Sequence, residues 1–569
     1  MKPHFIFIGS LALAIVLAPG ANAGTLKFTA EVPPPPPQLP LLRLAPQPPP
    51  IELINGFLAA SRVSAKLAPI SDTPLFRQNK LKVPSDVVGA FEGDHVRALV
   101  NRKTGDASIY PALGRLEPLA QADVEAQSSR ARDIFQTPAF IAHDDTRFVV
   151  DKPNTLNGQT MTRDQAGTVR IERPKSGFLS YFSARRFVGE LPVDGPGSRA
   201  LLELGRGGAV EGLVRVWKSA KTIRMVRPSH NSDQVRVAIS NQLRPALVNA
   251  DVTVDRIELA YYDSNNNYLQ PVYRFTAQIH HLTMPQTPPR TDDDFVIGYV
   301  PYAQAVEPLP GLGQGSGSSP RIPPKSATEI PGHRAASNSN DPIVGRYVVR
   351  NDDPGWVNDA NAFWNGLSST FTGPLFTNSQ YYWAEPRLFT NQKDSFINAM
   401  NLALSEDHGD WWLFSTLQNC CDLVNINGDI PAPGYGPSAN GALADWIIHS
   451  CEVIPSPDDT ANWPDPWWNV FGGVRNVVGY RTIMYINDQA GGPYGTSLGN
   501  LAPVVSSWLG DVSSLNAYSG NPTASAHGGV VRPMGRPSAI SACGHDTDTV
   551  LSTGTLSRAN CLTVWWVPD

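Results

Sequence analysis

The sequence has no apolar run long enough to cross a membrane. Its most apolar run, residues 5–18, falls short of the roughly 20 residues that a membrane-spanning helix needs. Lys2 precedes this run and Ala21 and Ala23 follow it, which is the pattern of a signal peptide with a small-residue cleavage site. We predict a secreted or periplasmic protein that is cleaved after Ala23. The alternative is that the run anchors the chain in a membrane.

The sequence also lacks an excess of charge of either sign. Its formal net charge is −5 over 569 residues. Proteins that bind nucleic acids or anionic membranes through charge carry a concentrated basic surface, and this composition does not indicate one. We therefore expect no nucleic-acid partner and no membrane anchor. We also expect no cofactor and no bound metal, and the sequence leaves the oligomeric state open.

Cysteine is rare and confined to the C-terminal part of the chain. The five cysteines are Cys420, Cys421, Cys451, Cys543 and Cys561. Adjacent Cα atoms lie about 3.8 Å apart, closer than a disulfide usually allows, so Cys420 and Cys421 are expected to have different partners. The favoured pairing joins them to Cys543 and Cys561, in either order, and leaves Cys451 as a thiol. The alternative joins Cys543 to Cys561, and Cys451 to Cys420 or Cys421.

Proline and glycine are abundant, with 52 and 47 residues, and they mark two expected linkers. Residues 24–50 are rich in proline and are predicted to form an extended spacer. Residues 305–342 lack apolar periodicity and are predicted to be flexible. This second segment contains basic residues that a protease could recognise, namely Arg321, Lys325 and Arg334. The linkers divide the chain into residues 51–304 and residues 343–569.

Residues 51–304 are predicted to form an α+β region of antiparallel strands with helices, as one module or two. Apolar residues alternate in residues 210–216 and 257–262, as in half-buried strands. Residues 234–243 place their apolar side chains on one helical face, with Ser232 as the expected cap. Across residues 191–217 and 260–275, the strands and turns resemble PepSY and fungalysin/thermolysin propeptide modules. That resemblance implies a chaperone or inhibitory role.

Residues 343–569 are predicted to be an α/β domain with a mostly parallel sheet. Strands are expected at residues 346–350, 442–448 and 478–486, and helices at residues 358–367 and 501–509. Strands that alternate with helices indicate a parallel sheet with both faces covered. In such sheets, ligands bind at the carboxyl ends of the strands. Side chains that follow two of the apolar runs are therefore the first candidates for a site.

Two apolar runs end in residues suited to nucleophilic catalysis. One run leads to His408 and Gly409, and the other leads to Cys451. A cysteine nucleophile needs a base that holds it as a thiolate, and His408 is the candidate base. The backbone N–H groups of Gly409 and Cys451 are candidate donors to a developing oxyanion. We predict attack of Cys451 on a carbonyl carbon, an acyl-enzyme, and its hydrolysis.

At these residues the chain resembles the caspase, gingipain and legumain group of cysteine peptidases. The matching stretches are LALSEDHG, at residues 402–409, and ALADWIIHSC, at residues 442–451. The resemblance implies a caspase-haemoglobinase-like fold, with His408 as the base, Cys451 as the nucleophile and Gly409 as an oxyanion donor. Residues 345–550 also resemble an uncharacterised family of bacterial and fungal secreted proteins. Ser450 and Asp407 depart from the peptidase pattern.

Two other groups of side chains are candidates for a site. His449 shares a face with Cys451 on an extended chain, so it is a second candidate base. His545, Asp546 and Asp548 have the atom types of a cation site, although such residues more often form a solvated turn.

The sequence therefore predicts a secreted cysteine hydrolase, an endopeptidase, that acts on a protein or peptide substrate. One alternative is a secreted binding protein on a degenerate peptidase fold, with grooves lined by tryptophan. Of the 13 tryptophans, 12 follow residue 350, where they line such grooves or fill the core. A further alternative is an amidase or esterase that uses Cys451 and His408.

Overall fold

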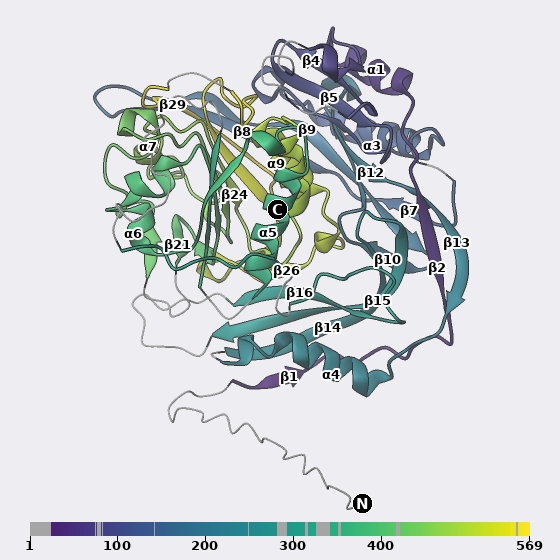
Figure 1. The fold of residues 1–569 in the computed structure, drawn as a ribbon. Helices are drawn as coiled ribbons and strands as arrows, with labels where there is room; N and C mark the ends of the chain where they lie inside the picture. The colour runs from purple at the N-terminus through teal and green to yellow at the C-terminus, as the bar shows by residue number, and fades with distance from the viewer. Residues whose placement is uncertain are drawn as a thin grey trace, which may run out of the picture.

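A computed structural model gives the arrangement of the chain (Figure 1). It describes residues 24–569 except 74–75, 77–80, 82–83, 142, 249, 282–292, 313–316, 326–341, 351–353, 417–421 and 553–555. The expected signal peptide lies outside the described residues. Of the helices that are described, none is long and apolar enough to cross a membrane. The protein is a sheet-rich α/β protein whose sheets mix parallel and antiparallel strands.

A parallel sheet forms the centre of the C-terminal half, as the alternation of strands and helices predicted. Its strands are, in spatial order, β18 (Thr377–Trp383), β17 (Ile343–Val348), β19 (Leu402–Glu406), β23 (Asp445–His449) and β24 (Asn476–Tyr480). Side chains of the central strands are buried on both faces. Leu404 and Ile447 belong to one apolar core, whereas Ala403 and Ile448 belong to another. This two-sided burial explains why these strands are continuous apolar runs.

Helices cover the first of these faces. They are α5 (Pro354–Ser368), α8 (Gly491–Gly499) and α9 (Val504–Ser513). The other face is covered by loops and by the short helices α6 (Pro386–Phe389) and α7 (Trp467–Val470). The predicted helices at 358–367 and 501–509 correspond to α5 and α9. The strand predicted at 478–486 is instead divided into β24 and β25 (Tyr485–Ile486).

The same sheet continues from the C-terminal half into the N-terminal half. Beyond β24 come the antiparallel strands β28 (Pro537–Ala542) and β29 (Cys561–Trp566). Strand β29 then pairs with β8 (Asn154–Arg163), from Cys561 opposite Thr162 to Trp566 opposite Asn157. The remaining strands of this sheet are β9 (Val169–Val188), β11 (Ser198–Leu204), β12 (Val210–Trp217), β6 (Ala107–Ile109), β5 (His95–Asn101), β4 (Val87–Glu92) and β3 (Ala68–Pro69). The two halves are therefore joined by backbone hydrogen bonds.

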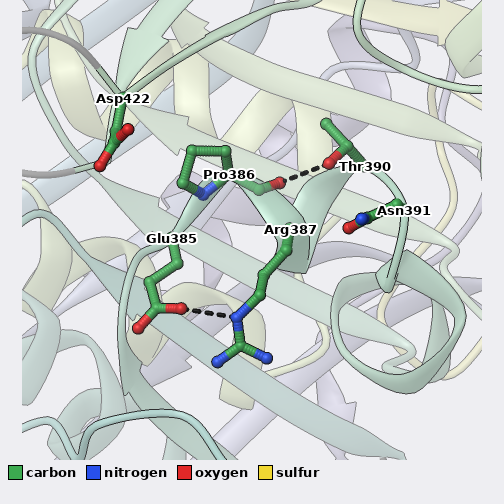
Figure 2. A pocket seen from close by; sticks show the side chains of 6 residues that line it. All are labelled: Glu385, Pro386, Arg387, Thr390, Asn391 and Asp422. Atoms are coloured by element: carbon green, nitrogen blue, oxygen red, sulfur yellow. Dashed lines mark hydrogen bonds and ion pairs between the residues drawn. The ribbon is translucent and has the colours of Figure 1, made fainter. Parts of the chain in front are cut away.

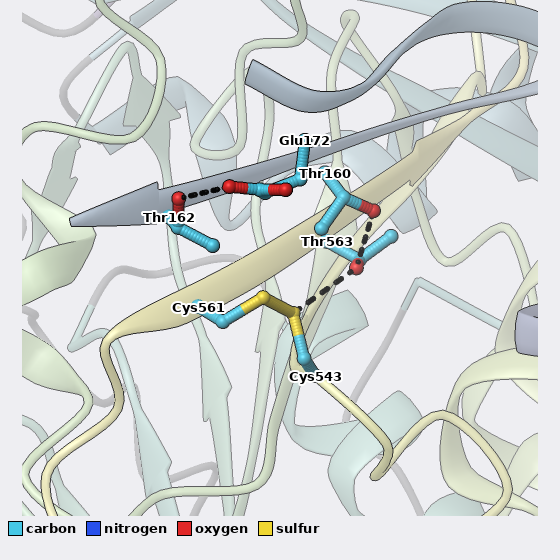
Figure 3. Close-up of a disulfide and its surroundings, with 6 residues drawn as sticks. All are labelled: Thr160, Thr162, Glu172, Cys543, Cys561 and Thr563. Carbon is cyan, nitrogen blue, oxygen red and sulfur yellow. Dashed lines mark hydrogen bonds between the residues drawn. A yellow bond between two sulfur atoms is a disulfide. The ribbon is translucent and has the colours of Figure 1, made fainter. Parts of the chain in front are cut away.

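A disulfide lies where the halves meet. Cys543 follows β28 and is bonded to Cys561 at the start of β29 (Figure 3). The favoured prediction, in which Cys420 and Cys421 bond to these two cysteines, is therefore wrong. The alternative prediction is confirmed in its pairing of Cys543 with Cys561, because the antiparallel strands β28 and β29 bring these residues to a Cα–Cα distance of 5.4 Å. Cys420 and Cys421 lie outside the described residues.

A second sheet belongs mainly to the N-terminal half. Its strands are β1 (Leu26–Phe28), β2 (Leu39–Ala45), β10 (Leu191–Asp194), β13 (Ser219–Val226), β14 (Ala250–Asp263), β15 (Tyr268–His281) and β16 (Asp294–Pro301), with β25 at one edge. Helix α4 (Ser232–Leu243) runs alongside this sheet in Figure 1. Its cap is Asn231, whose side chain accepts a hydrogen bond from the Gln234 backbone N–H, so the prediction of Ser232 was off by one residue.

The prediction that residues 24–50 are a spacer is wrong. Strand β2 pairs along its length with β13, and the side chains of Leu41, Leu42 and Leu44 are buried. The prolines lie mainly before and after this strand, and the leucines between them supply enough apolar surface for burial. The proline-rich segment is therefore part of the second sheet.

The second predicted linker also packs on the protein where it is described. Arg321 pairs with β18: its N–H donates to the Tyr381 carbonyl and its carbonyl accepts from the Trp383 N–H, each at 2.9 Å. Glu307 is buried, and its carboxylate accepts hydrogen bonds from Ser264 and from the Asn267 backbone N–H. The prediction of a flexible linker is therefore wrong for these parts of residues 305–342, because their polar groups have hydrogen-bond partners. Arg334 lies outside the described residues.

The remaining elements are two helices of the N-terminal half and several strands. The helices are α1 (Ile51–Ala60) and α3 (Gln121–Gln136), and the strands are β7 (Arg147–Val150), β20 (Gly409–Asp410), β21 (Leu413–Ser415), β22 (Leu423–Asn425), β26 (Thr523–Ser525) and β27 (Val531–Pro533). Strands β20, β21 and β22 form a small antiparallel sheet directly after His408.

Candidate functional site

The predicted residues His408, Gly409 and Cys451 come together at one edge of the parallel sheet. Strands β19 and β23 are adjacent and parallel, with Glu406 opposite His449, so His408 and Cys451 each lie two residues beyond a paired position. The loops touch as well. A Cβ atom added to Gly409 would lie 2.4 Å from the Cys451 carbonyl oxygen, which only a residue without a side chain avoids.

His408 is buried and is oriented by a carboxylate from the other half of the chain. Its Nδ1 lies 2.8 Å from Oδ1 of Asp294, the first residue of β16. The Trp356 ring of α5 packs edge-on against the imidazole, with the ring centroids 5.2 Å apart. Sequence reasoning missed Asp294, because nothing in its local sequence indicates that it will contact a residue 114 positions later.

Cys451 is buried beneath the segment between β24 and β25. The Met484 backbone N–H donates a hydrogen bond to Cys451 Sγ at 3.4 Å. Strand β25, which follows this segment, pairs in parallel with β16 through Tyr485 and Ile486. The N-terminal half therefore packs on the loop that covers Cys451 and also supplies the carboxylate beside His408.

His449, the second candidate base, lies among three carboxylates. Its Nδ1 is 2.5 Å from Glu406 Oε2 and 3.1 Å from Asp359 Oδ2, and its Nε2 is 3.4 Å from Asp488 Oδ1. All four side chains are at most 2% exposed. Helix α5 supplies Asp359, β19 supplies Glu406, and the turn after β25 supplies Asp488. We call these four residues the His449 cluster.

Burial and charge act against each other in the His449 cluster. Desolvation raises the pKa of Glu406 to about 8 and the pKa of Asp359 to about 6, although His449 opposes both shifts. Desolvation also disfavours the charged imidazole, but Glu406, Asp359 and Asp488 outweigh it and hold the pKa of His449 well above its usual value. The cluster therefore retains protons at neutral pH when no other cation is present.

Asp488 is held differently from the other two carboxylates. Its oxygens accept hydrogen bonds from the hydroxyls of Tyr480 at 2.5 Å and Tyr518 at 2.6 Å, and from the Ala490 backbone N–H at 2.8 Å. Desolvation raises its pKa, but His449 and these hydroxyl donors outweigh that effect and lower it. Asp488 is therefore the carboxylate of the cluster that stays ionised most easily.

A more exposed histidine lies near the same edge. His527 Nδ1 is 2.7 Å from Asp410 Oδ1, and its ring stacks on Trp411 with centroids 4.0 Å apart. The His527 backbone N–H also donates to the buried carboxylate of Glu452, next to Cys451. The sequence held no signal for these contacts, since His527 follows a segment without a predicted element.

The cluster of His545, Asp546 and Asp548 has other roles. Asp548 lies 2.8 Å from His545 Nδ1 and 3.5 Å from Arg475 Nε, whereas Asp546 accepts a hydrogen bond from the Gly114 backbone N–H at 2.6 Å. These contacts tie the turn to both halves of the chain. The tryptophans are mostly core residues. Eight are fully buried, namely Trp217, Trp356, Trp446, Trp463, Trp467, Trp508, Trp565 and Trp566.

Two surface pockets lie away from the predicted residues. One, of about 400 Å³, is lined by residues of α6 and its surroundings, among which Arg387 and Glu385 form an ion pair at 2.6 Å (Figure 2). The other, of about 650 Å³, belongs to the N-terminal half and is lined by Arg97, Arg115 and Glu211 among others. Neither pocket is lined by His408 or Cys451, whose side chains are buried.

Comparisons with known proteins find a family but no described activity. A family model described as "Domain of unknown function (DUF6345)" matches residues 351–536. None of the curated proteins matches the chain. A solved structure of an uncharacterized protein from Eubacterium rectale ATCC 33656 is similar to it with a TM-score of 0.28 and 9% identity, covering 49% of this chain and 88% of that one. The family match contains His408, Cys451 and the whole His449 cluster.

Proposed function

We propose that the protein is an exported cysteine hydrolase, an endopeptidase, in which Cys451 is the nucleophile and His408 is its base. The observation that carries the proposal is the position of these residues beyond adjacent parallel strands, with Asp294 Oδ1 at 2.8 Å from His408 Nδ1. A carboxylate on one imidazole nitrogen leaves the other nitrogen to exchange a proton with the nucleophile.

In the proposed reaction, His408 takes the proton of the Cys451 thiol, and the thiolate attacks the carbonyl carbon of a peptide bond. The backbone N–H groups of Gly409 and Cys451 donate to the oxyanion. The protonated His408 then gives its proton to the leaving amine, and the C–N bond breaks. Water, deprotonated by His408, hydrolyses the thioester and returns the thiol.

The resemblance to caspases, gingipains and legumains supports this class of reaction. Their signature places His-Gly after one apolar strand and cysteine after a second one, and here the two strands are neighbours in register. The caspase-like character of the C-terminal half is part of the proposal. Export is supported by the signal-peptide pattern of residues 1–23 and by the disulfide between Cys543 and Cys561.

The N-terminal half is proposed to act as an inhibitory or chaperone region. Strand β16 pairs with β25, and its Asp294 contacts His408, so this half covers the proposed site. The side chains of His408 and Cys451 are only 4% and 7% exposed. A peptide substrate therefore requires movement of the segment over Cys451 while β16 keeps Asp294 beside His408, for which cleavage between the halves is one route.

The test is covalent labelling of residues 24–569, before and after limited digestion with trypsin. Iodoacetamide and a peptidyl acyloxymethylketone are used, and labelled cysteines are mapped by mass spectrometry. We expect labelling of Cys451 that increases after digestion and falls about tenfold or more in His408→Ala. His545→Ala is the matched control, because that histidine pairs with Asp548 elsewhere.

Other outcomes distinguish the alternatives. Recovery of Cys451 in a disulfide-linked peptide, or no labelling after digestion, would favour the non-catalytic binding protein. Labelling that depends on His408 without cleavage of any peptide library would favour an amidase or esterase.

A further inference from the structure

Three side chains from three separate elements bring their ligand atoms together inside the protein. One oxygen each from Asp359 and Glu406 and one nitrogen of His449 all lie within 4.8 Å of one another. The side chains are at most 2% exposed. One imidazole with two carboxylates is a ligand set that suits divalent first-row transition metals such as Zn²⁺ and Mn²⁺.

Three buried atoms of these side chains have no hydrogen-bond partner among the described residues. Asp359 Oδ2 and His449 Nε2 each face an oppositely charged group, whereas Glu406 Oε1 is the remaining atom, although the Glu406 side chain is completely buried. Buried carboxylate oxygens are costly to leave without a hydrogen bond or a cation. The unpartnered oxygen belongs to the carboxylate nearest His449 Nδ1, where an ion would be placed.

The fourth member of the cluster has the position of a residue that orients a metal-binding histidine. Asp488 Oδ1 lies 3.4 Å from His449 Nε2, on the far side of the ring from Glu406 and Asp359. An Nε2–H group that points to Asp488 leaves the Nδ1 lone pair directed at the two carboxylates. Histidines that bind metals commonly donate their second N–H to a carboxylate, which fixes the tautomer.

The charges of the His449 cluster also favour a bound cation. Three carboxylates surround one imidazole in a buried site, so the fully ionised cluster with a neutral imidazole carries three negative charges. A dication would reduce this charge to −1, whereas an empty cluster must take up protons instead.

We infer that Asp359, Glu406 and His449 bind one divalent transition-metal ion, with His449 oriented by Asp488. Zinc bonds to these atoms are about 2.0–2.2 Å long, so Nδ1 and Glu406 Oε2, which are 2.5 Å apart here, would separate to admit the ion. The ion links α5 to the carboxyl ends of β19 and β23. Burial on all sides indicates a structural ion that holds these strand ends, from which His408 and Cys451 follow.

The first measurement is the metal content of the complete, tag-free protein, purified without chelators. Inductively coupled plasma mass spectrometry should find about one Zn²⁺, Mn²⁺ or Fe²⁺ per chain. Unfolding and refolding in the presence of a chelator should lower Tm, and added Zn²⁺ or Mn²⁺ should restore it by about 3 °C or more. Protein that contains no metal and whose Tm does not respond to these ions would overturn the inference.

Two variants assign the ion to this site. Glu406→Gln and Asp359→Asn keep the side-chain shape and should lower the retained metal at least about tenfold. The matched control is Asp445→Asn, which changes a buried carboxylate at the other end of β23 and should retain the metal. If the ligand variants retain the metal as the control does, the ion is elsewhere and the assignment is wrong.

The inference remains testable if those variants fail to fold. Wild-type protein refolded with Co²⁺ should show the visible absorption of cobalt bound by nitrogen and oxygen ligands, at about one equivalent. A spectrum identical to that of Co²⁺ in buffer would exclude the site. None of these measurements depends on peptidase activity.

Discussion

His408 and His449 follow neighbouring strands of one sheet, but their surroundings are built in different ways. His449 lies among Asp359, Glu406 and Asp488, all of which belong to the C-terminal half. His408 instead takes its carboxylate, Asp294, from β16 of the N-terminal half. The first arrangement takes all its side chains from the C-terminal half, although β25, which precedes Asp488, pairs with β16, whereas the second exists only while the two halves remain together.

The difference in charge suggests different roles for the two histidines. One carboxylate beside His408 balances an imidazolium, which suits a base that gains and loses a proton. Three carboxylates around His449 exceed what one imidazolium can balance, which suits the binding of a cation. Under the two proposals made above, the same sheet edge combines a proton-transfer site with a site that holds the strands in place.

The largest expected effect comes from removing one histidine at a time. His449→Ala leaves three buried carboxylates without their shared partner, and we expect it to lower the free energy of unfolding by about 5 kcal/mol. His408→Ala removes the ion pair with Asp294, and we expect a loss of about 3 kcal/mol. Guanidinium unfolding at pH 7 measures both. Equal losses in the free energy of unfolding would show that the two histidines have equivalent surroundings.

The next largest effect concerns the pH dependence of stability, which we expect from Asp445 at the other end of β23 from His449. Burial raises the pKa of Asp445 to about 7, because desolvation outweighs Arg475 and Asn476. An aspartate in the unfolded chain has a pKa of about 3.9, so the folded protein binds more protons between these values. The free energy of unfolding should therefore fall as pH rises from about 4 to 7, by about 4 kcal/mol from this group.

Asp445→Asn removes that titration and should flatten the decline over the same pH range. Urea unfolding at several pH values compares the variant with the wild-type protein. Parallel curves for the two proteins would show that Asp445 is not the group responsible, and that the pH dependence arises elsewhere, for example in the His449 cluster.

A smaller effect tests the contact between the halves. Asp294→Asn removes the charge beside His408, and we expect the rate of Cys451 labelling after digestion to fall about tenfold, or about 1.4 kcal/mol in barrier. Asp293→Asn is the matched control, because Asp293 contacts His280 at 2.7 Å instead. Asp294→Glu should restore part of the rate. Equal rates for the two Asn variants would show that His408 does not depend on β16.

The smallest effect is expected at the exposed edge. His527 is 40% exposed and pairs with Asp410, which is 34% exposed. His527→Ala should change the free energy of unfolding by at most about 1 kcal/mol, because exposed ion pairs contribute little. The same unfolding measurement gives the value. A loss as large as that of His449→Ala would show that burial does not decide how much each histidine contributes to the free energy of unfolding.

Sequence reasoning succeeded where the signal is local. The apolar runs before His408 and Cys451 predicted β19 and β23, and their alternation with helices predicted a parallel pairing that brings the two loops together. It failed where the partner is distant. Glu406 was visible in the segment SEDHG, Asp359 in a predicted helix, and Asp488 after a predicted strand, but nothing linked the three.

The favoured disulfide pairing and the prediction of a proline-rich spacer were wrong for related reasons. Cys543 and Cys561 meet because β28 pairs with β29, and residues 39–45 form a strand because β13 offers its edge. The amino-acid composition of a segment does not reveal which strand it will pair with. Backbone hydrogen bonds across a sheet are available to any sequence that can be extended there, so local preference decides them only weakly.

By itself, the sequence determined the apolar strands, the helices that alternate with them, and the candidate pair His408 and Cys451 at the strand ends, because periodicity and burial are recorded in neighbouring residues. Only the tertiary structure decided that Asp294 would face His408, that three carboxylates would surround His449, and that both halves would share one sheet. These contacts depend on register and on charges brought together from distant segments, and such information is not written in any one stretch of the chain.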